Sequence, residues 1–321
     1  MTDGRRNVLL LSAGRRVSLA RALAASARAI GAQLVTADMN PAMSAACQDN
    51  GLYATLPHVQ SDAYPAALRA VCAAHAIGLV IPTIDTELAT LAALRADLAG
   101  QGTEVVVSDA ALVDASRDKR RTAAYFQRFG IASPQIQDIG DLRFPVIAKP
   151  FDGSLSRDIT ILHSAADLTE KVRAVPNIIF ADYLDQKTHD EFTCDAYYTR
   201  SGQLACVVPR QRLEVRGGEV SKARAVRNDI VALFFEKLGQ IDGAKGCLTF
   251  QFFRHRDTGA HWLIELNARF GGGYPLTMAA GAAYHDWAVQ EYLSGKTPLR
   301  FDGWHNGLTM LRYDGEVFTD G

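Results

Sequence analysis

Short apolar runs alternate with amphipathic helical patterns along the first third of the chain. The runs expected to form strands are 8–12, 33–37, 53–56, 79–82 and 104–107, and the expected helices are 17–30, 62–75 and 86–98. Alternation of strands and helices at this spacing is typical of parallel βαβ units in a doubly wound sheet. We therefore expect an α/β, Rossmann-like N-terminal domain over residues 1–108.

The pattern changes after about residue 108. Expected helices at 118–129, 165–175, 229–238 and 284–293 are separated by longer alternating strands and hairpins, and residues 307–321 read as a terminal strand. Long alternating strands with fewer helices are typical of α+β domains. We expect two α+β subdomains, over residues 109–180 and 181–321, which with the first domain agree with a length of 321 residues.

Composition narrows the class of protein. Lys and Arg number 34 and Asp and Glu number 35, so the net charge of −1 gives no general attraction to nucleic acid or to a membrane surface. The 5 cysteines form no C-x-x-C or Cys/His cluster, which argues against disulfides and zinc. The longest uncharged stretches, 70–84 and 270–285, are too short to span a membrane. We expect a cytoplasmic protein.

The carboxyl ends of the first strands carry polar residues, at the edge where open α/β sheets bind ligands. We expect them to form the rim of a site for a small polar substrate: Arg15, Arg16, Asp38, Asp85 and Glu87. Helix capping is the alternative for Asp38 and Asp85. Because Gly14 is the only glycine after the first strand, the G-x-G-x-x-G pattern is absent and binding of NAD is disfavoured.

Residues 247–269 contain the most informative pattern. Two alternating runs flank Asp257-Thr258-Gly259, which predicts a β-hairpin with Gln251 opposite Glu265 and Thr249 opposite Asn267. The two-residue spacing places Glu265, Asn267 and Arg269 on one polar face. The opposite face is expected to be apolar, with Leu248, Phe250, Phe252, Trp262, Ile264 and Leu266. Carboxylate and amide oxygens suit Mg²⁺, and a solvated sheet face is the alternative.

This hairpin, together with Lys119 and Lys149, resembles the ATP-grasp superfamily, in the branch similar to the large chain of carbamoyl-phosphate synthase. The resemblance covers nearly the whole chain and implies a pre-ATP-grasp domain followed by two subdomains that clasp ATP. It implies that Gln251, Glu265 and Asn267 bind Mg²⁺, or Mn²⁺ in its place. It further implies that Arg269 stabilises the charge of phosphoryl transfer and of an acyl phosphate.

The same resemblance implies the ATP contacts. They are Lys119, Lys149, Ser154 and Ser156 for the phosphates, Asp182, Tyr183 and Leu184 for adenine, and Glu191 for the ribose. Two departures stand out: residues 152–157 keep a single glycine where the family has a glycine-rich loop, and Ala181-Asp182 stands where Gln-Glu is usual. An exposed strand glutamate is the alternative for Glu191.

The expected strand 204–216 places Arg210, Arg212, Glu214 and Arg216 on one side. Alternate arginines on one strand form a row that binds phosphate or carboxylate groups with paired donors. We expect Arg210 or Arg212 to contact the γ-phosphate or the carboxylate of the acceptor. The alternative is a charged, solvent-exposed edge strand.

These observations lead to the hypothesis of an ATP-dependent carboxylate–amine (or ammonia) ligase. A carboxylate is a poor electrophile until phosphorylation gives it a leaving group, and Arg269 with the backbone of Gly271, Gly272 and Gly273 is expected to stabilise the oxyanion. The expected partners are small acids and amines, and a homodimer is the commonest assembly. Carbamoyl-phosphate synthesis itself is disfavoured because the chain holds a single ATP-grasp unit. The alternatives are a phosphotransferase, an inactive nucleotide-binding regulator and an NAD-dependent oxidoreductase.

Overall fold

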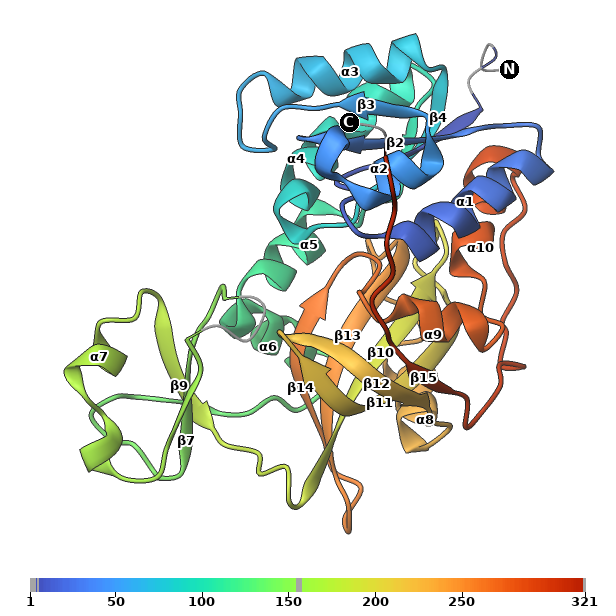
Figure 1. Ribbon diagram of the computed structural model, residues 1–321. Helices are drawn as coiled ribbons and strands as arrows, with labels where there is room; N and C mark the ends of the chain where they lie inside the picture. The colour runs from blue at the N-terminus through green and yellow to red at the C-terminus, as the bar shows by residue number, and fades with distance from the viewer. Residues whose placement is uncertain (1–3, 5, 154–157, 320–321) are drawn as a thin grey trace.

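Three β-sheets organise the protein. The structure is a computed structural model that describes residue 4, residues 6–153 and residues 158–319. The strand orders are β3-β2-β1-β4-β5, β6-β9-β7-β8 and β14-β13-β10-β11-β12-β15 (Figure 1). The first sheet is parallel and the other two are antiparallel. The predicted fold class, a Rossmann-like domain followed by α+β subdomains, is confirmed.

The N-terminal domain follows the apolar pattern of its sequence. Its strands are β1 (Asn7–Leu10), β2 (Leu34–Asp38), β3 (Tyr53–Thr55), β4 (Ile77–Ile81) and β5 (Glu104–Val105), and its helices are α1 (Val17–Ala29), α2 (Ala45–Asn50), α3 (Tyr64–Ala74) and α4 (Leu88–Gly100). Strands covered by helices on both faces are apolar throughout rather than alternating. In agreement, every residue of β4 is buried.

The small sheet forms a separate lobe beside the body of the molecule (Figure 1). It contains β6 (Ile136–Gln137), β7 (Val146–Pro150), β8 (Thr160–Leu162) and β9 (Ile178–Asp182), with the short helix α7 (Glu170–Arg173). Its core contains only a few buried side chains, among them Val146, Leu162 and Phe180. The helix expected over 165–175 is shorter than predicted, because a 3₁₀ turn at Ala165–Asp167 ends before Thr169 caps α7.

The large sheet supplies most of the remaining core. Its strands are β10 (His189–Tyr198), β11 (Leu204–Arg216), β12 (Glu219–Ala225), β13 (Gly246–His255), β14 (His261–Asn267) and β15 (Thr309–Leu311), and the associated helices are α5 (Ala110–Arg117), α6 (Lys119–Gln127), α8 (Asp229–Lys237), α9 (Tyr274–Ala279) and α10 (Tyr284–Ser294). Helices α5 and α6 precede the small sheet in the chain but contact β14. The ring of Phe126 in α6 meets that of Phe250 edge-on, at 5.6 Å between centroids. Lys119 is thereby fixed to the large sheet.

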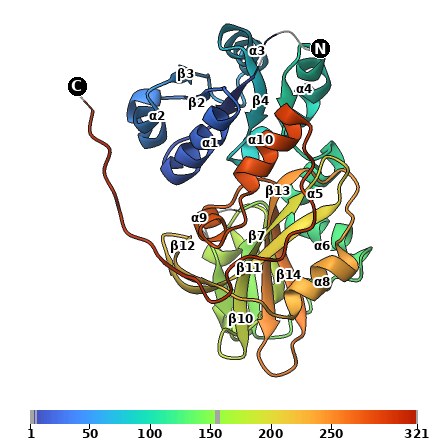
Figure 2. The same ribbon diagram turned by 90° about the vertical axis from the view of Figure 1, so that its right-hand side faces the viewer.

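Helix α10 joins the N-terminal domain to the large sheet (Figure 2). One continuous core contains Leu23 of α1, Ile81 of β4, Cys247 of β13 and Tyr292 of α10. The two regions are therefore packed together through side chains, and a site between them is held in a defined geometry. Within the residues that the structure describes, no helix is long and apolar enough to cross a membrane.

Candidate active site

The hairpin of β13 and β14 has the predicted register at its polar end. Gln251 pairs with Glu265 and Thr249 pairs with Asn267. The register shifts after Gln251, so that Phe252 pairs with Leu263 and Ile264 is the extra residue of a bulge. The predicted apolar face is therefore wrong at two positions. Leu263 is buried in the core, whereas Trp262 and Ile264 are only partly buried.

Two neighbouring cavities lie along this hairpin. The cavity that we call apolar has a volume of about 350 Å³ and lies between the small and large sheets, with Ile147, Ile161, Leu184, Phe253 and Ile264 in its wall. The cavity that we call charged has a volume of about 200 Å³ and lies between the large sheet and the N-terminal domain. Four residues line both cavities: Lys119, Gly153, Gln251 and Glu265.

The apolar cavity contains most of the residues predicted to bind ATP. Lys149, Tyr183, Leu184 and Glu191 line it, and so does Lys119. Burial lowers the pKa of Lys149 to about 8, an effect that the charge of Lys119 strengthens and that of Glu265 opposes. The Nζ of Lys119 donates to the backbone oxygen of Gly153, 2.8 Å away. Two ammonium groups thus lie at the end of the cavity that adjoins the charged one.

Two predicted ATP ligands in this wall already have protein partners. The carboxylate of Asp182 accepts from Gln137 Nε2 at 2.7 Å and from the backbone N–H of Gln135 at 3.1 Å, which ties β9 to β6 and to the residue before it. Glu191 accepts a hydrogen bond from Gln251 and lies 3.2 Å from Arg212 Nε. Ser154 and Ser156 lie outside the described residues.

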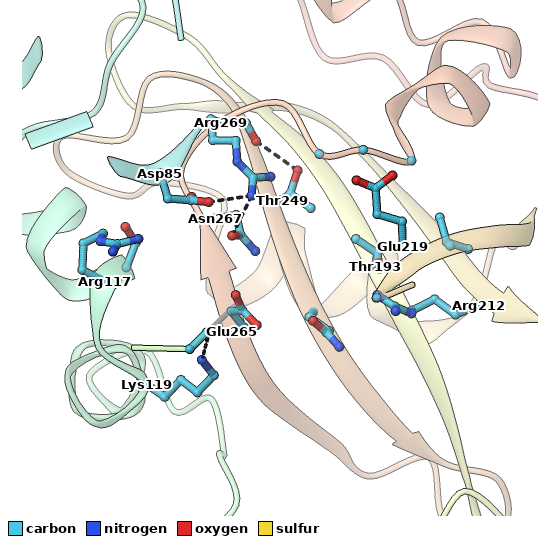
Figure 3. A pocket seen from close by; sticks show the side chains of 18 of the residues that line it. Asp85, Arg117, Lys119, Thr193, Arg212, Glu219, Thr249, Glu265, Asn267 and Arg269 are labelled. Carbon is cyan, nitrogen blue, oxygen red and sulfur yellow. Dashed lines mark hydrogen bonds and ion pairs between the residues drawn. The ribbon is translucent and has the colours of Figure 1, made fainter. Parts of the chain in front are cut away.

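The charged cavity is built around Arg269. Its Nη2 donates to Asp85 Oδ2 at 2.6 Å and to Asn267 Oδ1 at 3.0 Å, so a guanidinium from the large sheet is anchored by a carboxylate from the N-terminal domain. Figure 3 shows Asp85, Asn267 and Arg269 on one side of the cavity, with Glu219 and Arg212 on the opposite side. Arg269 is therefore oriented before any ligand enters.

The predicted arginine row on β11 is not a continuous surface. Register shifts on both sides of Glu214 interrupt the alternation. Both Arg210 and Arg212 line the charged cavity, but Arg210 is fully buried in an ion pair with Asp195, whereas Arg212 faces Glu191. Arg216 lies at the exposed end of the strand and pairs with Asp314. The prediction that these arginines form one anion-binding face is corrected accordingly.

The predicted substrate rim divides into two groups. Arg16, Asp85, Gly271, Gly272 and Gly273 line the charged cavity. Arg16 donates to the backbone oxygen of Thr83 at 3.2 Å, and burial, with the nearby charge of Arg269, lowers its pKa to about 10.

Arg15, Asp38 and Glu87 line neither cavity, which corrects their assignment. Arg15 is mostly exposed and pairs with Glu219 from outside, at 2.6 Å. Asp38 accepts from the backbone N–H of Gly14 at 2.9 Å, which fixes the turn after β1. Glu87 is buried and accepts from Thr83 N at 2.7 Å and from the hydroxyl of Ser12 at 2.8 Å. Burial raises the pKa of Glu87 to about 7.

Several residues of the charged cavity were not predicted. They are Ser116, Arg117, Asp152, Thr193, Glu219 and Thr249. Strand alternation could have found Thr193, which lies two residues beyond Glu191 and pairs with Gln251. Glu219 follows the Gly217-Gly218 turn, and its carboxylate accepts from Arg15 and Arg312. These three residues are far apart in the sequence, so no local pattern signals the contact.

The shared wall suits a hard divalent cation. Within the described residues, the carboxylate of Glu265 has no hydrogen-bond or ion-pair partner, while Gln251 donates through Nε2 to Glu191 and so keeps its amide oxygen available. Asn267 contributes a further amide oxygen, which already accepts one hydrogen bond from Arg269. The described part of the chain contains no cluster of three or more His, Cys, Asp or Glu residues suited to a metal. A donor set with one carboxylate fits Mg²⁺, which takes few protein ligands and completes its shell with water and phosphate oxygens.

The comparisons with known proteins agree with this sheet order and these paired cavities, because two family models each match a part of the chain. Residues 8–106 match the family model described as "PylC-like, N-terminal domain". Residues 174–310 match the model described as "ATP-grasp in the biosynthetic pathway with Ter operon". No curated protein matches the sequence. The resemblance seen in the sequence is thereby confirmed.

Solved structures share the fold at low sequence identity. The L-amino acid ligase from Bacillus licheniformis has a TM-score of 0.71 and 16% identity over 95% of this chain and 78% of its own. The biotin carboxylase domain of Hydrogenobacter thermophilus 2-oxoglutarate carboxylase, solved with MgADP, ADP and bicarbonate, has a TM-score of 0.71 and 16% identity over 95% of this chain and 73% of its own. Rhizobium etli pyruvate carboxylase has a TM-score of 0.71 and 13% identity over 92% of this chain. The chain spans only 30% of that enzyme.

Proposed function

We propose that the protein is an ATP-dependent ligase that joins a small polar carboxylic acid to an amine or ammonia through an acyl phosphate. The observation that carries the proposal is the wall of Lys119, Gly153, Gln251 and Glu265 shared by two cavities of different character. ATP in the apolar cavity and an acid in the charged cavity would meet at this wall. Such an arrangement favours direct transfer between them.

The apolar cavity provides what a nucleotide needs. Its branched and aromatic side chains offer flat apolar surface to a base, and its ammonium groups, Lys119 and Lys149, lie where the cavity joins its neighbour. A buried lysine whose pKa is about 8 regains its full charge beside a polyphosphate. Glu265, Gln251 and Asn267 would hold Mg²⁺, which neutralises phosphate charge when it is bound.

The reaction has two steps. A carboxylate oxygen of the acid attacks the γ-phosphorus, and the bond between that phosphorus and the oxygen that bridges it to the β-phosphate breaks, so that ADP leaves. The amine nitrogen then attacks the acyl carbon, phosphate leaves with the C–O bonding electrons, and the amine releases its proton. Arg269, oriented by Asp85 and Asn267, would stabilise the oxyanion of the second step.

Substrate-dependent release of ADP tests this function. Pools of carboxylic acids are incubated with MgATP and with amines or ammonium, and ADP is measured with and without each component. We expect ADP release only with an acid present, and a hydroxamate when hydroxylamine replaces the amine. Mass spectrometry then identifies the product.

Two results would contradict the proposal. A stable phosphorylated product without a hydroxamate would indicate a phosphotransferase. Binding of MgADP without ADP release from MgATP in any acid pool would indicate a nucleotide-binding regulator.

A further inference from the structure

The side chain of Arg210 leaves no room for any residue other than glycine at position 273. Its backbone angles, φ −89° and ψ 1°, are ones that other residues adopt. A Cβ atom at this position, however, would lie 1.8 Å from Nη1 of Arg210 and 2.8 Å from its Cζ. The guanidinium therefore occupies the space that a side chain would need, and any larger residue would displace the loop or the arginine.

In the loop Gly271–Gly273, side chains also lie directly against Gly271, but not against Gly272. A Cβ at Gly271 would lie 2.9 Å from the side chain of Thr249 and 3.4 Å from Asp195 Oδ1. At Gly272 the nearest group is the carboxylate of Glu219, at 3.5 Å, which is an ordinary contact. The loop thus rests on buried polar groups at Gly271 and Gly273, and it is open at Gly272.

Asp195 is the centre of the buried group below the loop. Its carboxylate accepts from Arg210 Nη2 at 2.9 Å, from the hydroxyl of Thr249 at 3.0 Å and from the hydroxyl of Thr277 at 2.6 Å. The side chains of Asp195 and Arg210 are 0% and 1% exposed. Because a buried charge is strongly disfavoured without its partner, Asp195 determines where Arg210 can lie.

Arg210 keeps donors that no protein group uses. Its Nε and Nη1 have no hydrogen-bond partner among the described residues, although both are buried. The side chain nevertheless forms part of the wall of the charged cavity. Nη2 points to Asp195 and Nη1 lies against Gly273, so the guanidinium links the buried carboxylate to the loop.

We propose that Asp195 is a positioning residue of the acid site, which holds Arg210 under the loop Gly271–Gly273 so that the loop forms a seat for a carboxylate anion. The proposal rests on the proposed function, because it concerns the cavity assigned there to the acid. Arg210 acts by supporting the loop and through the field of its guanidinium, which lies in the wall of the charged cavity. The expectation that Arg210 or Arg212 contacts the γ-phosphate or the carboxylate of the acceptor stays a prediction.

Binding of acetate in the presence of MgADP tests this proposal without turnover. Acetate is the simplest carboxylate probe, and its binding to the full chain is measured by saturation-transfer difference NMR. Asp195→Asn removes the charge while keeping the shape, and Gly273→Ala places a methyl group on the guanidinium. We expect each variant to lose at least about tenfold in acetate affinity, with MgADP affinity within about twofold, because neither position lines the apolar cavity.

Two matched controls separate positioning from a general loss of stability. Gly100→Ala adds the same methyl group at the end of α4, where nothing lies within 4 Å of the added Cβ and where the residue lines neither cavity. Glu291→Gln alters another buried carboxylate, which lines neither cavity and accepts from the hydroxyl of Tyr197 at 3.0 Å and from Arg200 N at 3.0 Å. Both controls should keep acetate and MgADP binding within about twofold.

The proposal is overturned if folded Gly273→Ala binds acetate as the wild type does. It is equally overturned if either control loses acetate to the same extent, or if the wild type with MgADP shows no acetate signal. Gly273→Ala leaves the buried charges unaltered, so it decides the matter even if Asp195→Asn does not fold. Failure of the ligase assay would leave these binding results unchanged, which keeps the two proposals distinguishable.

Discussion

The two cavities differ in how the charged side chains of their walls are paired. In the apolar cavity, Lys149 is a buried cation in a mostly apolar wall, with a lowered pKa. In the charged cavity, three arginines have carboxylate partners, in the pairs Arg269–Asp85, Arg210–Asp195 and Arg212–Glu191. A largely apolar wall with two ammonium groups, those of Lys119 and Lys149, attracts any ligand that combines a flat ring with phosphates. In the charged cavity, a ligand must offer polar groups that match the charged side chains of the wall. We therefore expect substrate selectivity to reside in this cavity.

The largest effect is expected at the residues that line both cavities, where the proposed nucleotide and acid sites meet. Glu265→Gln should lower acid-dependent ADP release on the order of 10²–10³-fold, because it removes the one carboxylate of the proposed metal site. It should also make the affinity for ADP insensitive to Mg²⁺, as measured by calorimetry with and without the metal. Gln251→Glu, which adds a carboxylate to the same wall, is the matched comparison and should preserve the Mg²⁺ dependence. Unchanged Mg²⁺ dependence in Glu265→Gln would remove this residue from the site.

A change confined to the apolar cavity should have a smaller and separable effect. Lys149→Met should weaken MgADP binding about 10- to 100-fold, because a charge-assisted hydrogen bond contributes about 1.5–3 kcal/mol. Acetate binding in the charged cavity should stay within about twofold at saturating MgADP.

The pH dependence sharpens that prediction. In the free protein Lys149 loses its proton above a pKa of about 8, whereas bound phosphate favours the protonated form. Binding therefore takes up a proton above pH 8, and the affinity of the wild type for MgADP should fall as pH rises from 8 to 10. A Lys149→Met protein with the same slope would assign the effect to another group.

The smallest effect on ligand binding is expected at Glu87, which lies behind the charged cavity and affects stability instead. Its carboxyl group has a pKa raised from 4.5 to about 7 by burial, so between these values the folded state binds more protons than the unfolded state. Stability should therefore be greatest at low pH and fall as pH rises through 7, by up to about 3 kcal/mol. Glu87→Gln keeps an oxygen acceptor for the backbone N–H groups of Thr83 and Ile84 and places an amide donor against the hydroxyl of Ser12. It should flatten this decline in melting temperature. Ligand binding should not change, and a large loss of acetate affinity would return Glu87 to the site.

The sequence predicted those parts of the fold that depend on regular alternation. The parallel sheet and the pairing of Gln251 with Glu265 both follow from local periodicity and one recognisable turn. The bulge at Ile264 does not, because one extra residue in a strand leaves no signature in residue type and yet moves a side chain from the core into a cavity. The same is true of β11, where register shifts separate Arg210 and Arg212 from Arg216.

The sequence does not show which polar residues of the N-terminal domain line the charged cavity. Arg16 and Arg15 are neighbours of the same type, but only Arg16 reaches the charged cavity. Asp38 and Glu87 accept backbone hydrogen bonds instead of facing a ligand. The hydrogen-bond partners of these side chains are backbone groups that only the fold brings close. Composition and residue spacing do not reveal such groups.

The ion pair between Asp85 and Arg269 has a consequence for biosynthesis. Its partners are separated by 184 positions, so at about 5–20 residues per second the ribosome needs roughly 10–40 s to go from one to the other. The N-terminal domain can emerge and fold during that interval, but one wall of the charged cavity is still missing. Until Arg269 has been synthesised, therefore, the nascent chain lacks the guanidinium proposed to stabilise the oxyanion, and the proposed ligation cannot be completed.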